Sequence, residues 1–343
     1  MTFAEKLNNL HSRQVDYNIS VEDALSSSVE KSLYEGLGDS KQFSAKKKGE
    51  AENAQDYAVD SMKEIPTAPS YEAGEKIKKH LKEKLPSYGF NPDFEYQGSV
   101  ICNTHIKYHS DIDLLVLNDR FITVERPGDS FVAYKGNVIE DMQALRNACY
   151  AILKEVYSVS EIDNNGEKSI KIKKGGVLKR DIDVVPANWF DSVKYKTYGN
   201  NYLRGVQVFN KITCERTKNF PFLNKKLIND KDKLCNGNYR ALVRLAKNLR
   251  VDSDSSAQIK KISSYDIQSI FFAIENTDIN NLPKPELVNY GCEYLFYLVA
   301  NTEVFRTMKV PDETRLISEK VSFDMLKSLY DEFDELYNKI RGF

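Results

Sequence analysis

Two short acidic segments constrain the fold of this chain more than any other feature. The segment DID at residues 111–113 runs directly into the apolar stretch LLVL, and a second DID at residues 181–183 runs into VVPA. Because side chains alternate along a strand, Asp111 and Asp113 project from the same face. Carboxylates placed in this way repel one another unless a cation neutralises them, and hard oxygen donors of this kind suit Mg²⁺.

A Gly-Ser pair precedes the first acidic segment by eleven residues. Gly98 permits close approach of the backbone to a phosphate, and Ser99 adds a hydroxyl donor. Taken singly, this pair is an ordinary turn and DID is a polar strand edge. The second DID favours a different interpretation, because a third carboxylate from another strand is what a two-metal phosphoryl-transfer site requires.

The length of 343 residues predicts two lobes rather than one. Strand patterns and amphipathic helices occupy the middle of the chain, and mostly helical patterns follow from about Tyr239. We therefore predict an α+β fold in which residues 1–200 form a catalytic lobe with N-terminal helices. Residues 201–343 then form a helical lobe that closes the cleft beside the acidic segments.

The N-terminal sixty residues are polar, with one helical pattern. Apolar residues recur every fourth position from Val21 to Leu33, which predicts a helix there. Residues 36–60 carry few large apolar side chains. We predict a solvated loop or an exposed helix for them.

Charge and cysteine content narrow the classes of partner and compartment. Lys and Arg total 49 against 50 Asp and Glu, so no global field attracts nucleic acid or an anionic membrane. No apolar run approaches the roughly 18 residues of a membrane helix, and the first residues lack the pattern of a signal peptide. The five cysteines are scattered. These features predict a cytoplasmic protein with no membrane partner.

The helical half carries groups that suit a polyphosphate. Arg240, Arg244 and Lys247 lie at i, i+4 and i+7 on one stripe of a predicted helix. This stripe is either a solvated basic face or a set of phosphate ligands. Ser264 stands at a helix start, where a hydroxyl lies beside free N–H groups, and Tyr265 offers an aromatic face for a base.

These motifs together resemble a known family. GSVICNTHIKYHSDIDLLVL and RDIDVVPAN are similar to the CD-NTases of bacterial anti-phage defence, relatives of cyclic GMP-AMP synthase and oligoadenylate synthase. The resemblance covers about residues 92–275 and implies a bilobed, polymerase-beta-like nucleotidyltransferase fold. It implies that Asp111, Asp113 and Asp183 are catalytic metal ligands, because the family's third acid directly precedes two apolar residues. Asp181 projects from the same face and stays an alternative.

The resemblance also implies the nucleotide contacts. Gly98, Ser99, Lys247 and Ser264 would contact the donor triphosphate, with Arg244 as a weaker candidate. Tyr265 would stack on the nucleobase.

The function that follows is Mg²⁺-dependent synthesis of a cyclic di- or oligonucleotide from NTPs, with release of pyrophosphate. We expect two Mg²⁺ ions, with Mn²⁺ as a substitute, and ATP and one other NTP as substrates. The resemblance further implies an effector protein that senses the product and regulatory partners in a defence operon. Since the charge is balanced, we expect no nucleic-acid activator. Two alternatives remain at this stage: a nucleotidyltransferase that modifies an antibiotic, a protein or an RNA end, and a non-catalytic nucleotide-binding module.

Overall fold

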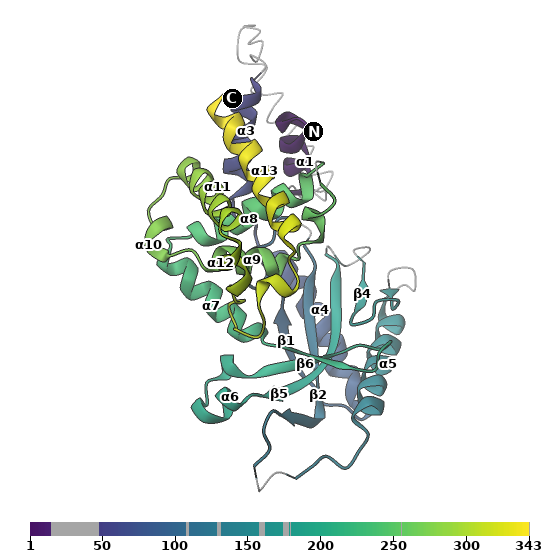
Figure 1. The fold of residues 1–343 in the computed structure, drawn as a ribbon. Helices are drawn as coiled ribbons and strands as arrows, with labels where there is room; N and C mark the ends of the chain where they lie inside the picture. Colours follow the sequence, from purple (N-terminus) through teal and green to yellow (C-terminus); the bar gives the residue numbers. More distant parts are fainter. Residues whose placement is uncertain are drawn as a thin grey trace, which may run out of the picture.

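The computed structural model describes residues 1–14, 48–107, 110–128, 132–157, 162–173, 178, 180–254 and 256–342. The helix predicted between Val21 and Leu33 lies outside these residues. Figure 1 shows a sheet below a group of helices that contains both termini. This arrangement agrees with the α+β fold and the helical lobe predicted from the sequence.

Within the described residues, seven strands form one mixed sheet in the order β1-β2-β5-β4-β3, with β6 between β5 and β7. The strands are β1 (Asp93–Gln97), β2 (Ile112–Val124), β3 (Ile162–Asp163), β4 (Ile170–Ile172), β5 (Ile182–Asp191), β6 (Gly205–Phe209) and β7 (Arg216–Asn219). The central pair β2–β5 is parallel, and the other pairs are antiparallel. The β3–β4 pair is a hairpin in which the sequence DNNG at residues 163–166 leads from β3 into the loop, and an Asn-Gly step favours a tight turn.

The two faces of the central strands have different surroundings. Leu114 and Val184 are register partners and pack into a core with α4 (Ala68–Lys84) and α5 (Val138–Val156), which cover one face (Figure 1). Leu115 and its partner Val185 point to the opposite face, into a smaller cluster. Because side chains alternate, the aspartates at the start of both strands lie on this second face.

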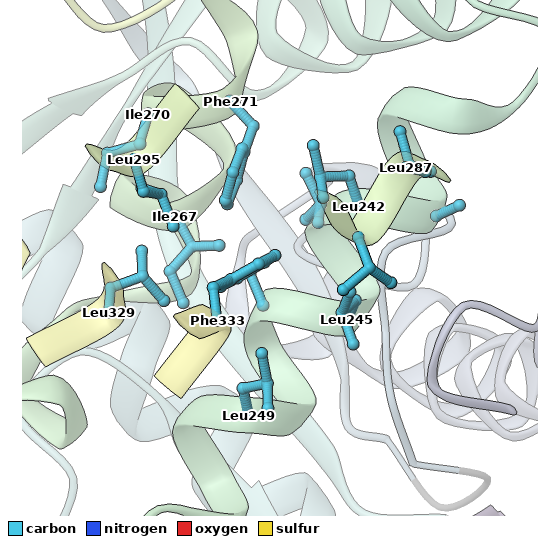
Figure 2. Packing of buried hydrophobic residues seen from close by; sticks show 14 of the residues in the cluster. Leu242, Leu245, Leu249, Ile267, Ile270, Phe271, Leu287, Leu295, Leu329 and Phe333 are labelled. Atoms are coloured by element: carbon cyan, nitrogen blue, oxygen red, sulfur yellow. The ribbon is translucent and has the colours of Figure 1, made fainter. Parts of the chain in front are cut away.

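The C-terminal lobe is built around α8. Its helices are α7 (Pro221–Leu234), α8 (Asn238–Asp252), α9 (Ser264–Phe272), α10 (Asn276–Ile279), α11 (Lys284–Ala300), α12 (Thr302–Thr307) and α13 (Phe323–Arg341). Short helices complete the chain: η1 (Leu85–Tyr88), α6 (Val193–Tyr198), η3 (Asn201–Leu203), η4 (Ile259–Lys261) and η5 (Ile317–Glu319). Leu242, Leu245 and Leu249 of α8 pack with Phe271 and Phe333 (Figure 2). This apolar core fixes the position of α8 beside the sheet.

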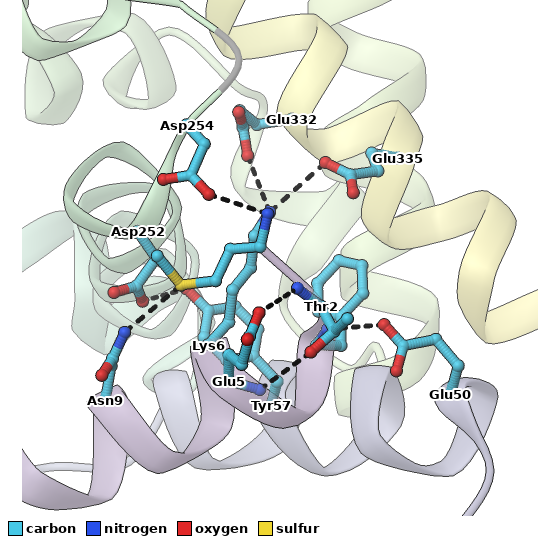
Figure 3. A network of polar contacts seen from close by, with 12 residues as sticks. Thr2, Glu5, Lys6, Asn9, Glu50, Tyr57, Asp252, Asp254, Glu332 and Glu335 are labelled. Atoms are coloured by element: carbon cyan, nitrogen blue, oxygen red, sulfur yellow. Dashed lines mark hydrogen bonds and ion pairs between the residues drawn. The ribbon is translucent and has the colours of Figure 1, made fainter.

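Two N-terminal helices, α1 (Phe3–Gln14) and α3 (Glu50–Ser61), pack against α13 and α8. The buried Lys6 ammonium lies 3.1 Å from the Glu332 carboxylate of α13. The Tyr57 hydroxyl donates to Asp252 of α8 at 2.8 Å (Figure 3). The expectation of a solvated segment at 36–60 is therefore wrong for residues 50–60, and residues 36–47 lie outside the described chain.

The packing differs from the predicted division at residue 200. Strands β6 and β7 follow that residue and still belong to the sheet. Helices α1 and α3 precede it and contribute to the apolar core of the C-terminal helices. The helical lobe therefore combines both ends of the chain. No helix among the described residues is long and apolar enough to cross a membrane.

Candidate active site

The acidic segments meet at the N-terminal ends of the parallel strands β2 and β5. Asp113 is the register partner of Asp183, so their side chains lie on the same face of adjacent strands. The Ile112 N–H donates to the Asp181 carbonyl oxygen at 3.4 Å, which extends the same register by one residue. The fold therefore brings all four aspartates to one edge, as the repeated motif predicted.

Burial and the repulsion between neighbouring carboxylates both make ionisation of these aspartates unfavourable. Burial, Asp183 and Asp111 raise the pKa of Asp113 to about 7. Burial also raises the pKa of Asp183, while Lys171 and a hydrogen bond from Ser169 at 3.2 Å oppose that rise. A carboxylate that is this costly to ionise is stabilised when a cation binds beside it. The site has the electrostatics of a cation-binding centre.

The donor set fits a hard divalent ion. Mg²⁺ prefers carboxylate oxygens and substrate phosphates, and Asp111, Asp113 and Asp183 supply the carboxylates. In the described parts of the chain, no three His, Cys, Asp or Glu side chains are gathered closely enough to hold an ion as they stand. Asp111 is instead paired with Lys171 at 2.6 Å. Binding of an ion therefore requires these side chains to adjust.

Gly98 lies directly over the acidic edge. Its φ of +93° belongs to the left-handed region, and a Cβ built on it would lie 2.1 Å from Asp113 Oδ2. Gly98 is thus required both for its backbone conformation and for its contact with a carboxylate. The Thr104 N–H donates to the Ser99 carbonyl oxygen at 3.0 Å, which closes the turn after β1.

A cavity of about 690 Å³ joins the acidic edge to the helical lobe. Its lining residues are Ser99, Ile106, Lys107, Ser110, Asp111, Asp113, Lys171, Asp181, Asp183, Lys247, Arg250, Val251 and Ser264. The cavity therefore brings carboxylates from the sheet together with cations and a hydroxyl from the helices. This volume falls within the range of small-molecule sites.

The basic residues of α8 differ in their surroundings: two arginines bind backbone carbonyls away from the cavity, and the lysine lines the cavity. Arg240 donates to the Cys102 carbonyl oxygen at 2.7 Å, and Arg244 donates to the Asn103 carbonyl oxygen at 2.8 Å. Neither arginine lines the cavity, so Arg244 does not fit its predicted contact with a triphosphate. Lys247 lines the cavity while it donates to the next carbonyl in the chain.

Lys247 is a buried lysine in the wall of the cavity. Burial and the charges of Arg250 and Arg244 lower its pKa to about 7. A bound polyphosphate would favour the ammonium form, since a neighbouring anion stabilises a charged amine.

Ser264 and Tyr265 lie in different cavities. Ser264 lines the cavity of the aspartates and accepts a hydrogen bond from Arg250 at 3.3 Å. Tyr265 lines a neighbouring cavity, with the Arg315 guanidinium 5.6 Å from its ring centre. Stacking of a base on Tyr265 stays a prediction. Arg250 was missed by sequence reasoning, although it continues the basic stripe three residues after Lys247.

The segment between the Gly-Ser turn and β2 contains two histidines, His105 and His109. His105 is buried, and burial lowers its pKa to about 4, which is typical of a packing residue. His109 lies outside the described residues.

The structure thus brings acidic residues of two parallel strands together in one cavity with Ser99 and with Lys247 of the helical lobe, an arrangement suited to metal-dependent nucleotidyl transfer. Residues 226–338 match the family described as "cGAS/DncV-like nucleotidyltransferase C-terminal helical domain". The cyclic dinucleotide synthase CdnE of Yersinia aleksiciae is 34% identical over 80% of this chain and 73% of its own length. A c-di-GMP synthase of a Lachnospiraceae bacterium is 30% identical over 80% of this chain and 84% of its own length.

The similarity extends to the whole structure. The STING-associated CdnE c-di-GMP synthase of Capnocytophaga granulosa has a TM-score of 0.76 and 28% identity, and the match covers 100% of this chain and 99% of that one. The chain belongs to the bacterial CD-NTase family of cyclic dinucleotide synthases. It is therefore a nucleotidyltransferase, and the relatives named above are synthases of cyclic dinucleotides. Membership of this family removes the two alternatives that the sequence left open.

Replacing Lys247 with glutamine tests its predicted contact with the triphosphate. We expect KM for the nucleotide to rise about 10- to 100-fold, the range for losing one charge-assisted hydrogen bond, with a smaller change in kcat. Lys284 supplies a matched control, because it is a half-buried lysine of the same lobe that donates to Asn238 at 2.7 Å. Steady-state kinetics in which Lys247→Gln and Lys284→Gln behave alike would contradict the assignment.

Proposed function

We propose that this enzyme joins two molecules of GTP into cyclic di-GMP at the cavity between β2, β5 and α8. The chemistry is carried by one observation, the register of Asp113 with Asp183 beside the Gly98–Ser99 turn in a cavity that also contains Lys247. The choice of GTP is supported by the relatives from Lachnospiraceae and Capnocytophaga granulosa, which are both named c-di-GMP synthases. It differs from the sequence prediction of ATP with one other NTP.

The residues of the site would form two groups, one that binds the metal ions and one that binds the nucleotide. Asp111, Asp113 and Asp183 would hold two Mg²⁺ ions, for which Mn²⁺ can substitute. When bound, the ions supply positive charge at the transferring phosphate and lower the pKa of the attacking ribose hydroxyl. These carboxylates therefore act by holding charge at a fixed place rather than by forming a covalent bond.

The remaining polar groups would bind and orient the donor. Ser99, Lys247 and Ser264 line the same cavity as the carboxylates, and Gly98 directly precedes Ser99. They would hold the triphosphate with its α-phosphorus in line between the acceptor hydroxyl and the leaving pyrophosphate. A second transfer, with the roles of donor and acceptor exchanged, closes the ring.

The biological setting follows the same relatives. The Capnocytophaga granulosa enzyme is described as STING-associated. We propose that this chain likewise acts in the cytoplasm in anti-phage defence, with an effector protein that binds its product and regulatory partners of the same operon. We propose that it needs no nucleic-acid activator, because its charge is balanced at a net −1.

The experiment is an incubation of the purified chain with each NTP alone and with all pairs, in Mg²⁺, followed by phosphatase treatment and mass spectrometry. We expect GTP alone to yield a phosphatase-resistant product with the mass of cyclic di-GMP, without added DNA or RNA. A resistant product that forms only when ATP is present would overturn the choice of GTP. A strict requirement for nucleic acid would overturn the predicted independence of activator.

A further inference from the structure

Lys171 places a positive charge among the aspartates. It belongs to β4, whose antiparallel register with β5 sets it opposite Asp183. Its Nζ lies 2.6 Å from Asp111 Oδ2 and 3.8 Å from Asp181 Oδ2. One ammonium group therefore bridges the two acidic segments at the place where a divalent ion would bind.

The fold holds the segment that carries Lys171. Arg146 of α5 is buried, and its Nη2 lies 2.8 Å from each of three acceptors in the β3–β4 hairpin: Asn164 Oδ1, the Gly166 carbonyl oxygen and the Ser169 carbonyl oxygen. Ser169, two residues before Lys171, donates to Asp183 at 3.2 Å. The hairpin is thus held by hydrogen bonds to α5 on one side of the sheet and to Asp183 of the acidic edge on the other. The position of Lys171 follows from this packing.

The Lys171 side chain also has room to move. It is 35% exposed and lines the same cavity as the aspartates. Its ammonium group can leave Asp111 and remain in contact with the cavity. A backbone held in place and a partly exposed ammonium group are what a lysine needs if a metal ion is to displace it from a carboxylate.

We propose that Lys171 is an exchangeable counter-ion, which neutralises the acidic edge before metal binds and is displaced from Asp111 by the incoming ion. The proposal rests on the metal site of the proposed function. An oxygen that accepts an ammonium hydrogen bond at 2.6 Å has to be released before it can ligate a metal. A divalent ion close to the ammonium is also repelled by it.

The exchange has a consequence for the order of binding. In the nucleotide-free enzyme, a displaced ammonium loses its ion pair with Asp111, the shorter of its two, so Lys171 opposes the entry of a free ion. A triphosphate in the cavity supplies new anionic partners for that ammonium. Lys171 therefore favours loading of the metal together with the nucleotide over loading of the free ion.

The test is a titration of the nucleotide-free, full-length protein with Mn²⁺, followed by the electron paramagnetic resonance of free Mn²⁺. Wild type, Lys171→Met and Asp113→Asn are compared. We expect Lys171→Met to bind Mn²⁺ about tenfold more tightly than wild type, because the competing unit charge is gone. Its melting temperature without metal should fall, and Mn²⁺ should raise it more than in wild type.

Lys107→Met is the matched control. Lys107 lines the same cavity, and it is not paired with any of the four aspartates. The substitution removes the same unit of charge from the cavity without removing an ion pair of the acidic edge. We expect its Mn²⁺ affinity to stay within about twofold of wild type.

The outcomes separate the two proposals. If wild type binds Mn²⁺ no better than Asp113→Asn, the metal site itself is wrong. If wild type binds Mn²⁺ at Asp113 but Lys171→Met binds it equally or more weakly, the metal site stands and the counter-ion role is overturned. Equal gains from Lys171→Met and Lys107→Met would also overturn it, since the effect would then be one of total charge.

Discussion

Replacing Asp111 and Asp113 together by asparagine is expected to abolish cyclic product, with a loss in kcat on the order of a thousandfold or more. Asparagine keeps the shape of each side chain but removes the negative charge that would hold the ions. Release of pyrophosphate and formation of phosphatase-resistant product, both measured from GTP, report the loss. A well-folded double variant that still turns over would refute the metal assignment.

The dependence of stability on pH supplies a second readout for the same variant. The pKa of Asp113 is about 7 in the folded chain against a usual value of 3.8. A carboxyl whose pKa is raised by folding contributes its stability below the unfolded pKa and loses it as the pH rises through the folded pKa. Metal-free wild type should therefore lose thermal stability between about pH 4 and about pH 7. The double variant should lack this decline and melt above wild type at about pH 8.

Single substitutions decide which aspartate of β5 is the third ligand. Asp183 is the register partner of Asp113, whereas Asp181 lies one position before the strand begins and faces Lys171 at 3.8 Å. We expect Asp183→Asn to be as inactive as the double variant and Asp181→Asn to retain most turnover. The opposite order would assign the third ligand to Asp181.

Replacing Gly98 with alanine is expected to have the largest effect after the loss of the catalytic carboxylates. The new Cβ would lie 2.1 Å from Asp113 Oδ2 in a backbone with φ of +93°, so either the turn or the carboxylate has to shift. A displacement of about 1 Å at a catalytic group can reduce the rate about a hundredfold. We expect a loss of that order in kcat/KM, measured from GTP.

Gly199→Ala is the control for Gly98→Ala, because it strains a left-handed backbone conformation without causing a steric clash. Gly199 ends α6 with a φ of +70°, and a Cβ there meets nothing within 4 Å. We expect it to lose about 1 kcal/mol of stability and to keep its activity. If both glycine variants lose activity alike, the contact with Asp113 is not the reason for the glycine.

The acidic edge shows what the sequence could predict about the site. Two DID segments before apolar stretches predicted same-face carboxylates on two strands, because alternation along a strand is a local rule. The apolar residues that follow Asp183 in the sequence did not indicate which strand would pair with its strand. They also did not indicate the register of that pairing. The parallel alignment of Asp113 with Asp183 became visible with the fold.

The basic stripe of α8 shows what helical spacing could not predict, namely which groups lie opposite the stripe. Helical spacing placed Arg240, Arg244 and Lys247 on one side, and this is how the structure has them. Spacing carries no information on what lies opposite, and two of the three cations face backbone carbonyls of residues 102 and 103. Arg250, one turn further along, lines the cavity instead.

The burial of helix α3 was missed for a different reason, although an exposed helix was one of the two structures predicted for this segment. Its buried side consists of Ala54, Tyr57, Ala58 and Ser61, which follow helical spacing. Three of these four side chains are small and give a weak hydrophobic signal, although small residues allow close approach of helices. Their partners on α1 and α13 are distant in sequence, so their burial depends on contacts that no local pattern contains.

The three hydrogen bonds from α8 to successive carbonyls have a consequence for the mobility of the enzyme. Arg240, Arg244 and Lys247 bind the carbonyl oxygens of Cys102, Asn103 and Thr104, and Cys102 itself is packed in the core of the helical lobe. If the two lobes swing apart to admit substrate or discharge product, this loop travels with the helices. The backbone would then have to bend before this loop, at Gly98, the glycine that follows β1 and has a φ of +93°.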